Sequence, residues 1–282
     1  MTEFQRIEIT PLSGAIGAEI HGVDIAKGID DETIAEIRQA LLDYLVVFFR
    51  DQNLDDDTHK AFARRFGSIF RHPNFDVGTG DPEIVRLVRA PGDGHVVGEE
   101  WHSDTTMMAT PPMGAILYAL EVPPYGADTL FANQYLAYEA LSCGMKKMLS
   151  GLRAVHSDVR VAGPQAAMNA QRSSKVREDE AWRPTESIHP VVVRHPETGR
   201  KLLFLNSVYV QRFDRMTVEE SKPLLDVLCE IGNRPEFTCR FAWQPGSIAF
   251  WDNRCTKHIA LNDVPQFARR MQRVQIAGTP LA

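Results

Sequence analysis

The apolar residues near the start of the chain follow two different spacings. Between residues 34 and 45 they recur every three or four positions behind Asp30 and Asp31, so a helix is predicted to begin near Asp31. The apolar run at 46–49 follows directly and is typical of a buried strand. Residues 59–67 form a second predicted helix, which ends at Gly67.

Short β-type runs dominate the rest of the chain. They occupy 7–9, 18–23, 83–89, 114–122, 129–133, 187–194, 201–206, 237–243, 247–251 and 269–277. Turn sequences at 196–199 and 244–246 each predict a hairpin between the runs on either side. Further helices are predicted at 135–142, 145–150 and 217–231. Many short strands with few helices favour a β-sandwich or jelly roll with helical decoration, in a single domain spanning 1–282.

One long segment lacks this pattern. Residues 158–186 are polar and show no clean periodicity. A loop of this length in a folded domain is typical of a functional lid or of a disordered segment. We expect a lid over the active site.

Composition narrows the class of protein. The 282 residues are 44% hydrophobic and 24% charged, with a net charge of −6, so the chain has no overall positive field to attract nucleic acid. The four cysteines form no C-x-x-C pair, which favours a reducing compartment over a disulfide framework. No secretory pattern and no apolar run of about 18 residues is present. We therefore expect a cytoplasmic protein that binds neither membrane nor nucleic acid.

The tripeptide His-Ser-Asp occurs twice, at 102–104 and at 156–158. Residues two apart in a strand point to the same face, so each copy can offer an imidazole and a carboxylate to one metal. Two histidines and one carboxylate are the ligands of many non-haem Fe(II) oxygenases. His258, behind a predicted strand, is the best third ligand. Spacing alone favours hydrogen-bonded surface pairs at both copies.

Several further motifs appear in a fixed order along the chain. They are 9–12, 17–20, 46–52, 66–67, 101–104, 126–129, 189–192, 251–254, His258, Arg269 and Arg273. Together they closely resemble the Fe(II)- and 2-oxoglutarate-dependent dioxygenases of the taurine dioxygenase / 2,4-dichlorophenoxyacetate dioxygenase family, nearly from end to end. The resemblance implies a mainly β fold with flanking helices, a double-stranded β-helix or jelly roll.

The resemblance also implies the metal ligands. In the family the metal-binding step follows a tryptophan and precedes a Gly-x-Asp-Thr motif, as residues 102–104 do here. His102, Asp104 and His258 are therefore the expected Fe(II) ligands, and Asp158 is not expected to bind the metal.

The contacts to 2-oxoglutarate follow from the same resemblance. Thr129 and Arg269 match the family residues that bind its far carboxylate. A planar guanidinium suits a carboxylate because two parallel N–H bonds fix its orientation. Arg273 matches the arginine that holds the anionic group of the substrate. Arg270 should point the other way along the strand.

Three further residues are candidate substrate contacts. His72 matches a substrate-contacting histidine of taurine dioxygenase, with a plain loop histidine as the alternative. Tyr209 could donate to a substrate carboxylate or simply pack in a strand. His156 could shape the pocket or, with Asp158, anchor the lid by hydrogen bonds.

The expected substrate is a small organic anion. Phe75 and Gly98 stand where taurine dioxygenase has a tyrosine and an asparagine, which disfavours taurine. Segments 97–101, 155–157 and 206–212 look more like the phenoxypropionate dioxygenases. The resemblance thus favours an aryloxyalkanoate-like carboxylate, with a taurine-like alkylsulfonate or an alkyl sulfate as the alternative within the family.

The implied reaction hydroxylates the substrate with Fe(II), O2 and 2-oxoglutarate, and it releases succinate and CO2. Relatives are often homo-oligomers, so we expect a homo-oligomer. Two other classes stay open. A Zn-dependent hydrolase could use the same three ligands but would not need Thr129 and Arg269. A non-catalytic anion-binding protein of the same fold is the other.

Overall fold

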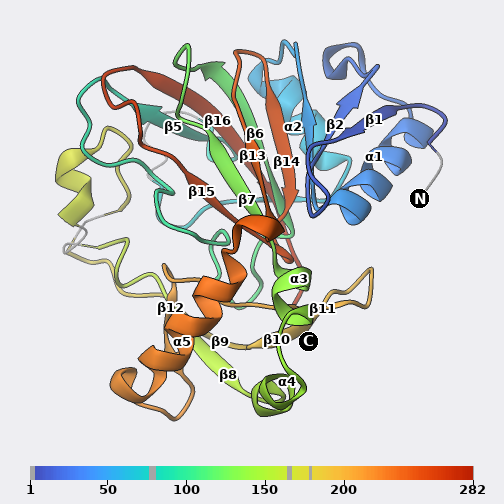
Figure 1. The fold of residues 1–282 in the computed structure, drawn as a ribbon. Helices are drawn as coiled ribbons and strands as arrows, with labels where there is room; N and C mark the ends of the chain where they lie inside the picture. Colours follow the sequence, from blue (N-terminus) through green and yellow to red (C-terminus); the bar gives the residue numbers. More distant parts are fainter. Residues whose placement is uncertain (1–3, 76–80, 164–166, 178–179, 282) are drawn as a thin grey trace.

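The largest sheet has eight strands and forms the upper part of the molecule in Figure 1. The computed structural model describes residues 4–75, 81–163, 167–177 and 180–281. The sheet order is β1 (Glu8–Pro11), β2 (Ala18–His21), β3 (Val46–Phe49), β14 (Ile248–Asp252), β6 (Gly114–Glu121), β16 (Arg269–Ile276) and β4 (Ile69–Phe70). β5 (Val85–Arg89) also pairs with β16. Among these described strands, β2 and β3 run parallel and the other neighbours run antiparallel.

A second sheet has three strands, in the order β13 (Thr238–Phe241), β7 (Thr129–Asn133) and β15 (Thr256–Ala260). One apolar core joins it to the large sheet. Phe48 of the large sheet stacks on Phe241 of the small sheet, with ring centroids 4.0 Å apart. Trp251 and Phe131 meet in the same core, with centroids 5.7 Å apart. The two sheets therefore pack face to face through aromatic side chains.

The outer face of the large sheet is covered by two helices, α1 (Asp31–Tyr44) and α2 (Asp56–Arg64) (Figure 1). The start of α1 agrees with the prediction, because the side chain of Asp30 caps it by accepting from the backbone N–H of Thr33 at 2.7 Å. α2 begins three residues earlier than expected, because Asp55 caps it through Thr58. Each helix buries its apolar face against the sheet and exposes its polar face.

The remaining elements form a separate layer at the bottom of Figure 1. It contains the sheet β12 (Val210–Phe213), β8 (Arg153–Ser157) and β9 (Glu186–Pro190), and the pair β10 (Val192–Arg194) and β11 (Lys201–Leu203). Around these strands lie α3 (Gln134–Glu139), α4 (Cys143–Leu149) and α5 (Val218–Gly232), which share an apolar core with them. Short 3-10 turns occur at η1 (Ile25–Lys27), η2 (Ala167–Gln171) and η3 (Pro235–Phe237).

The two predicted hairpins have different outcomes. The first is confirmed, since Arg194 pairs with Lys201 across the turn. The second is wrong, because β13 pairs with β7 whereas β14 pairs with β3 and β6 in the other sheet. Gly246 in the intervening turn is held by Gln52, whose backbone N–H donates to its carbonyl at 2.9 Å. Turn residues show that the chain reverses, but not which sheet the next strand joins.

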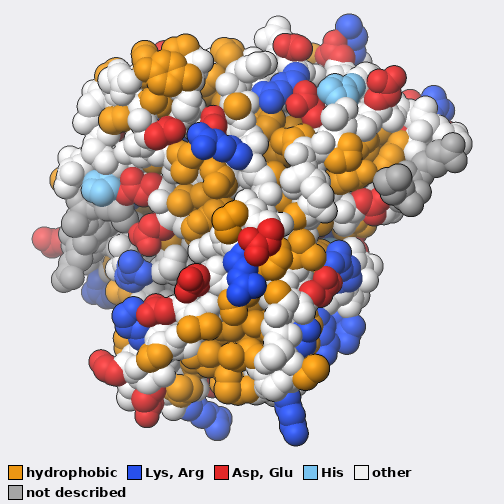
Figure 2. All heavy atoms as spheres, in the orientation of Figure 1, with side chains coloured by type: hydrophobic (Ala, Val, Ile, Leu, Met, Phe, Trp, Pro, Cys, Tyr) orange, Lys and Arg blue, Asp and Glu red, His pale blue; other side chains and the backbone are white. Residues whose placement is uncertain are grey.

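The prediction of a mainly β protein with flanking helices is confirmed at the level of mixed sheets and few helices. No helix among the described residues combines the length and apolarity needed to cross a bilayer. On the face shown in Figure 2, basic and acidic side chains are interspersed rather than gathered in one region of a single sign.

Candidate active site

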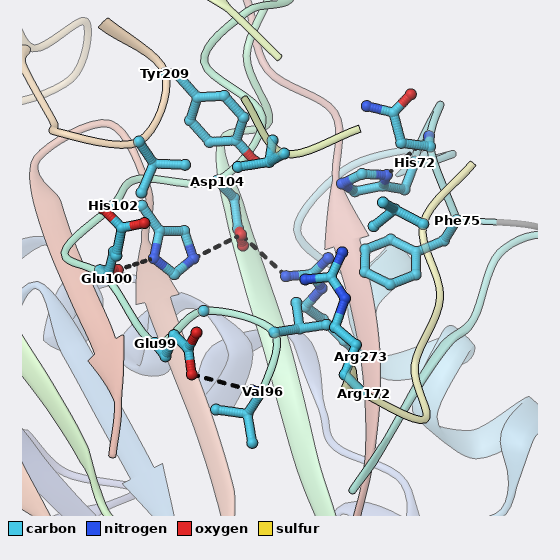
Figure 3. Close-up of a pocket in the computed structure, with 16 residues that line it drawn as sticks. His72, Phe75, Val96, Glu99, Glu100, His102, Asp104, Arg172, Tyr209 and Arg273 are labelled. Atoms are coloured by element: carbon cyan, nitrogen blue, oxygen red, sulfur yellow. Dashed lines mark hydrogen bonds and ion pairs between the residues drawn. The ribbon is translucent and has the colours of Figure 1, made fainter. Parts of the chain in front are cut away.

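A cavity that opens to solvent lies at the end of the large sheet (Figure 3). Its wall is formed by side chains of several loops and of β16. They are His72, Asn74 and Phe75, residues 96–100, His102, Asp104, Val161, Arg172, Val176, Val208, Tyr209 and Arg273. The lining combines apolar side chains with a few polar groups, as ligand pockets usually do. His102 and Asp104 of the first His-Ser-Asp tripeptide line this cavity.

His102, Asp104 and His258 come together there, although 154 residues separate the last two. One ligand atom from each lies within 4.8 Å of the others, and all three residues are buried. The backbone creates this arrangement, because His102 and His258 exchange two N–H···O bonds of 3.0 and 2.8 Å. Asn253 adds a side-chain bond of 2.6 Å to the backbone N–H of Asp104. His258 lies inside β15, a strand that the sequence pattern did not predict.

The protonation states of this group suit a metal cation. His102 donates from Nδ1 to the carbonyl of Glu100 at 2.7 Å, which directs Nε2 toward Asp104. Burial alone would raise the pKa of Asp104, but the Arg273 guanidinium and the His102 hydrogen bond hold it well below its ordinary value. Burial lowers the pKa of His258 well below its ordinary value, so its imidazole is neutral. A neutral imidazole and an ionised carboxylate are the forms in which these two residues bind a metal.

One carboxylate oxygen of Asp104 also favours a bound cation. Oδ1 of Asp104 accepts from Nη1 of Arg273 at 2.9 Å. Its other oxygen, Oδ2, is buried and has no hydrogen-bond partner among the described residues. A buried carboxylate oxygen without a donor is costly, and a bound cation would satisfy it. The donor set of two imidazoles and one carboxylate fits Fe(II).

The two residues predicted to bind 2-oxoglutarate are linked by a third. Trp243 donates its indole N–H to the Thr129 hydroxyl at 2.9 Å. The guanidinium carbon of Arg269 lies 5.7 Å from the centre of the same indole ring, within cation–π range. Nε and Nη2 of Arg269 are buried without a partner among the described residues. Two such donors on one guanidinium suit a carboxylate ligand. No sequence pattern marked Trp243, because its contacts join three different elements.

The predicted alternation along β16 is confirmed. Arg269 and Arg273 are buried, whereas Arg270 between them is exposed. Arg273 reaches the cavity, where Figure 3 shows it between Asp104 on one side and His72 and Phe75 on the other.

His72 and Tyr209 also line the cavity. Nδ1 of His72 accepts from the backbone N–H of Asn74 at 3.1 Å, so a neutral ring carries its proton on Nε2. Desolvation, with Arg273 nearby, lowers the pKa of His72 to about 3 and keeps the ring neutral. Tyr209 lies across the cavity in Figure 3, and the residue is 8% exposed.

His156 lies elsewhere. It is fully buried, it is absent from the cavity wall, and its Nδ1 bonds the Thr106 hydroxyl at 2.9 Å. Asp158 accepts from Asn74 Nδ2 at 2.7 Å and from the backbone N–H of Thr185 at 2.8 Å. The second His-Ser-Asp copy thus bonds neighbouring segments, and its side chains do not join the group formed by the first.

The segment predicted as a lid contributes directly to the cavity. Val161, Arg172 and Val176 belong to it and line the wall. Val176 also makes a β-bridge with Phe75. Arg172 is positioned by two bonds to Oδ1 of Asn169, at 3.1 and 2.7 Å. Sequence reasoning missed Arg172, since a polar loop without periodicity does not show which side chain turns inward. Residues 164–166 and 178–179 of the segment lie outside the described residues.

A second group of metal-binding side chains brings together His195, Asp252 and Cys255. Here the carboxylate already has its partners. Asp252 accepts from His195 at 3.0 Å and from two nitrogens of Arg254 at 2.9 and 2.5 Å. This buried, compensated network holds the β10–β11 turn against β14 and has no oxygen left for a metal.

The sequence was compared with known proteins. The family model described as "Taurine catabolism dioxygenase TauD, TfdA family" matches residues 8–275. An alkylsulfatase of Acinetobacter baylyi is 36% identical, over 97% of this chain and 86% of its own length. An alpha-ketoglutarate-dependent sulfate ester dioxygenase of Pseudomonas putida is 33% identical, over 96% of this chain and 90% of its own.

A further relative is an (S)-phenoxypropionate/alpha-ketoglutarate-dioxygenase of Sphingobium herbicidovorans, 31% identical over 97% of this chain and 96% of its own length. Among solved structures, a taurine dioxygenase from Burkholderia xenovorans superimposes with a TM-score of 0.83 at 37% identity, covering 99% of this chain and 91% of that one. Both the sequence and the fold match over nearly the whole length.

Proposed function

The chain belongs to the TauD/TfdA family of Fe(II)- and 2-oxoglutarate-dependent dioxygenases, and from this premise we propose that it hydroxylates a small organic anion with an apolar body. The observation that carries the proposal is the cavity in Figure 3, where His102, Asp104 and Arg273 meet under an apolar wall. Membership of this family sets aside the hydrolase and the non-catalytic alternatives.

In the proposed site His102, Asp104 and His258 would hold Fe(II). When bound, Fe(II) together with 2-oxoglutarate and O2 supplies the oxidising power for hydroxylation, with succinate and CO2 as co-products. Arg269 and the Thr129 hydroxyl bind the far carboxylate of 2-oxoglutarate. Its orientation follows from the paired N–H donors that Arg269 leaves without a partner.

The substrate is held at its charged end and packed at its apolar end. Arg273, with Nε2–H of His72 and the hydroxyl of Tyr209, offers donors to an anionic group. Around these donors lie Phe75 and five valines, Val96, Val97, Val161, Val176 and Val208. The valines exclude water from the reacting carbon. A small anion with one charged end and an apolar body would fit this arrangement of donors and apolar side chains.

Two substrate classes share the chemistry. In both, the oxidised carbon bears an oxygen, so the hydroxylated product is unstable and splits. An aryloxyalkanoate would give a phenol and a 2-keto acid, and the name of the Sphingobium relative supports it. An alkyl sulfate would give an aldehyde and sulfate, and the names of the two relatives with higher identity support it. We retain the aryloxyalkanoate as first candidate because segments 97–101, 155–157 and 206–212 resemble the phenoxypropionate dioxygenases, and the alkyl sulfate as second.

The test has two stages. An anaerobic absorbance titration of the apoprotein with Fe(II) and then 2-oxoglutarate should produce a metal-to-ligand charge-transfer band. Succinate release is then measured over a panel of aryloxypropionates, alkyl sulfates and taurine. Stimulation by one class assigns the substrate. A band without stimulation by any panel member contradicts the substrate proposal, and no band in folded, iron-loaded protein contradicts the assignment of the site residues.

We also infer that the two facing sheets form the double-stranded β-helix expected from the family. Four pairs of strands that follow each other in the chain, β6–β7, β13–β14, β14–β15 and β15–β16, alternate between the large and the small sheet. Such alternation is how a chain winds through a jelly roll.

A further inference from the structure

Arg89 and Arg269 lie directly opposite each other on the neighbouring antiparallel strands β5 and β16. Two positions along, Leu87 faces Met271, and both contact the core between the two sheets. Because side chains two apart in a strand share a face, both arginines point to this interior side. They are only 4% and 9% exposed. Two arginine side chains therefore enter the same buried region from adjacent strands.

No carboxylate of the described residues forms an ion pair with either arginine. Arg89 bonds the carbonyl of Phe267 through Nε and the Asn262 side chain through Nη1, both at 3.2 Å. Its third nitrogen, Nη2, is buried without a partner within the described chain, and so are Nε and Nη2 of Arg269. Burial and then the charge of Arg89 lower the pKa of Arg269 to about 10. Like charges placed opposite each other destabilise a sheet, and buried charges need a counter-ion.

The two arginines lie near the proposed metal site. Both line a narrow cavity together with Val96, Val97 and Ala260. Val96 and Val97 line the larger cavity as well, and Ala260 comes two residues after His258. An anion that extends from the metal ligands past these residues would place its far end between the guanidiniums.

We propose that Arg89 is a second cationic residue for the far carboxylate of 2-oxoglutarate, alongside Arg269. This inference rests on the proposed function. A carboxylate has acceptor sites for about four hydrogen bonds, so it can accept from both guanidiniums and from Thr129. The bonds from Arg89 to Phe267 and Asn262 hold its head in place. The consequence is stronger selection for 2-oxo acids that carry a second carboxylate.

The test compares two co-substrates that differ only at the far end. Dissociation constants for 2-oxoglutarate and for 2-oxopentanoate are measured anaerobically on the Fe(II)-loaded enzyme, from the charge-transfer band and from tryptophan fluorescence. Arg89→Gln should weaken 2-oxoglutarate about tenfold, the size of a charge-assisted hydrogen bond. It should change 2-oxopentanoate less than about twofold, well under the effect of such a bond. Arg89→Lys should lie between the wild type and Arg89→Gln.

Two control variants test whether the effect comes from the charge of Arg89. Arg86→Gln removes an arginine from the same strand, where its exposed head pairs with Asp56 at 2.6 Å, and it should leave both constants unchanged. Asn262→Ala removes one anchor of Arg89 and keeps the charge, so it should weaken 2-oxoglutarate less than Arg89→Gln does. If Arg89→Gln folds poorly, Arg89→Lys and Asn262→Ala still test the proposal.

Contrary results are distinguishable. An unchanged constant for 2-oxoglutarate in Arg89→Gln, or equal weakening of both co-substrates together with a lower melting temperature, would overturn the role of Arg89. Arg269→Gln tests the premise separately. If it also leaves 2-oxoglutarate binding intact, the proposed placement of the co-substrate fails, whereas weakening by Arg269→Gln alone overturns only the further inference.

Discussion

The indole N–H of Trp243 donates a hydrogen bond to the hydroxyl oxygen of Thr129 at 2.9 Å. Because that oxygen accepts here, the hydrogen of the hydroxyl points away and can be donated to a ligand. The face of the same indole lies under Arg269. One side chain thus orients both residues proposed to bind the far carboxylate, which makes Trp243 a positioning residue.

Replacing Trp243 with Phe should weaken 2-oxoglutarate binding several-fold. The substitution keeps an aromatic ring beside Arg269 but removes the N–H, a bond of about 1 kcal/mol. Anaerobic titration of the charge-transfer band measures the effect, and kcat at saturating 2-oxoglutarate should change little. Thr129→Val removes the other partner, so the double variant should be less than additive. Additive effects would show that the two residues act independently.

Asp104→Ala and Asp158→Ala should separate the two His-Ser-Asp copies. The first should abolish Fe(II) binding and the charge-transfer band, because Asp104 supplies the only carboxylate near His102 and His258 among the described residues. The second should keep the band and lose about 1–3 kcal/mol of stability, because Asn74 and the N–H of Thr185 lose a buried acceptor. Metal titration and thermal unfolding report the two effects. A lost band in folded Asp158→Ala would contradict the assignment.

Arg273→Gln should raise the KM of the organic anion at least tenfold, the effect expected when a charged donor is removed. It should affect 2-oxoglutarate binding less, since Arg269 lies four residues away along β16. Fe(II) affinity should also fall, because the bond to Asp104 is lost. Arg270→Gln is the matched control, as its side chain is exposed. Equal effects of both substitutions on KM would argue against a direct contact.

Gly98→Ala should weaken metal binding. Gly98 has a φ of +86°, which costs a non-glycine residue roughly 1–2 kcal/mol. A Cβ there would lie 3.0 Å from Cε1 of His102, so the imidazole would have to move. The dissociation constant for Fe(II) or Mn(II) should increase, with a lower melting temperature. Gly92→Ala, also at positive φ but with nothing near its Cβ, is the control for backbone strain alone.

His59 should make stability depend on pH. Burial lowers its pKa from 6.5 to about 4, and its Nδ1 accepts from Gln272 at 3.1 Å. The unfolded chain therefore binds a proton at higher pH than the folded one, so stability falls as pH drops from about 6.5 to 4 and levels off below. The loss attributable to this group is about 3 kcal/mol. Denaturant unfolding across this range should show a shallower decline for His59→Gln, and identical slopes would contradict this origin.

Much of the fold could be predicted from local pattern. The runs at 46–49 and 129–133 match β3 and β7 residue for residue, because each is a continuous or nearly continuous apolar segment next to a clear boundary. β8, β12 and β15 escaped prediction, because their side chains mix polar and apolar types. In β15 even Lys257 is buried. The second hairpin was predicted wrongly for a different reason. The partner of each strand depends on contacts with distant parts of the chain, and β13 and β14 join different sheets.

The candidate site likewise has a part that the sequence predicted and a part that only the structure showed. Ordered motifs along the chain were enough to identify the family and to select His102, Asp104 and His258, and the period of a strand was enough to separate Arg270 from Arg269 and Arg273. Only the tertiary structure placed His156 outside the cavity, brought Arg172 into it, and set Trp243 and Arg89 beside Arg269. Spacing along a chain determines which side chains of one strand share a face. Contacts between different elements depend on how the sheets pack, and no local pattern encodes this packing.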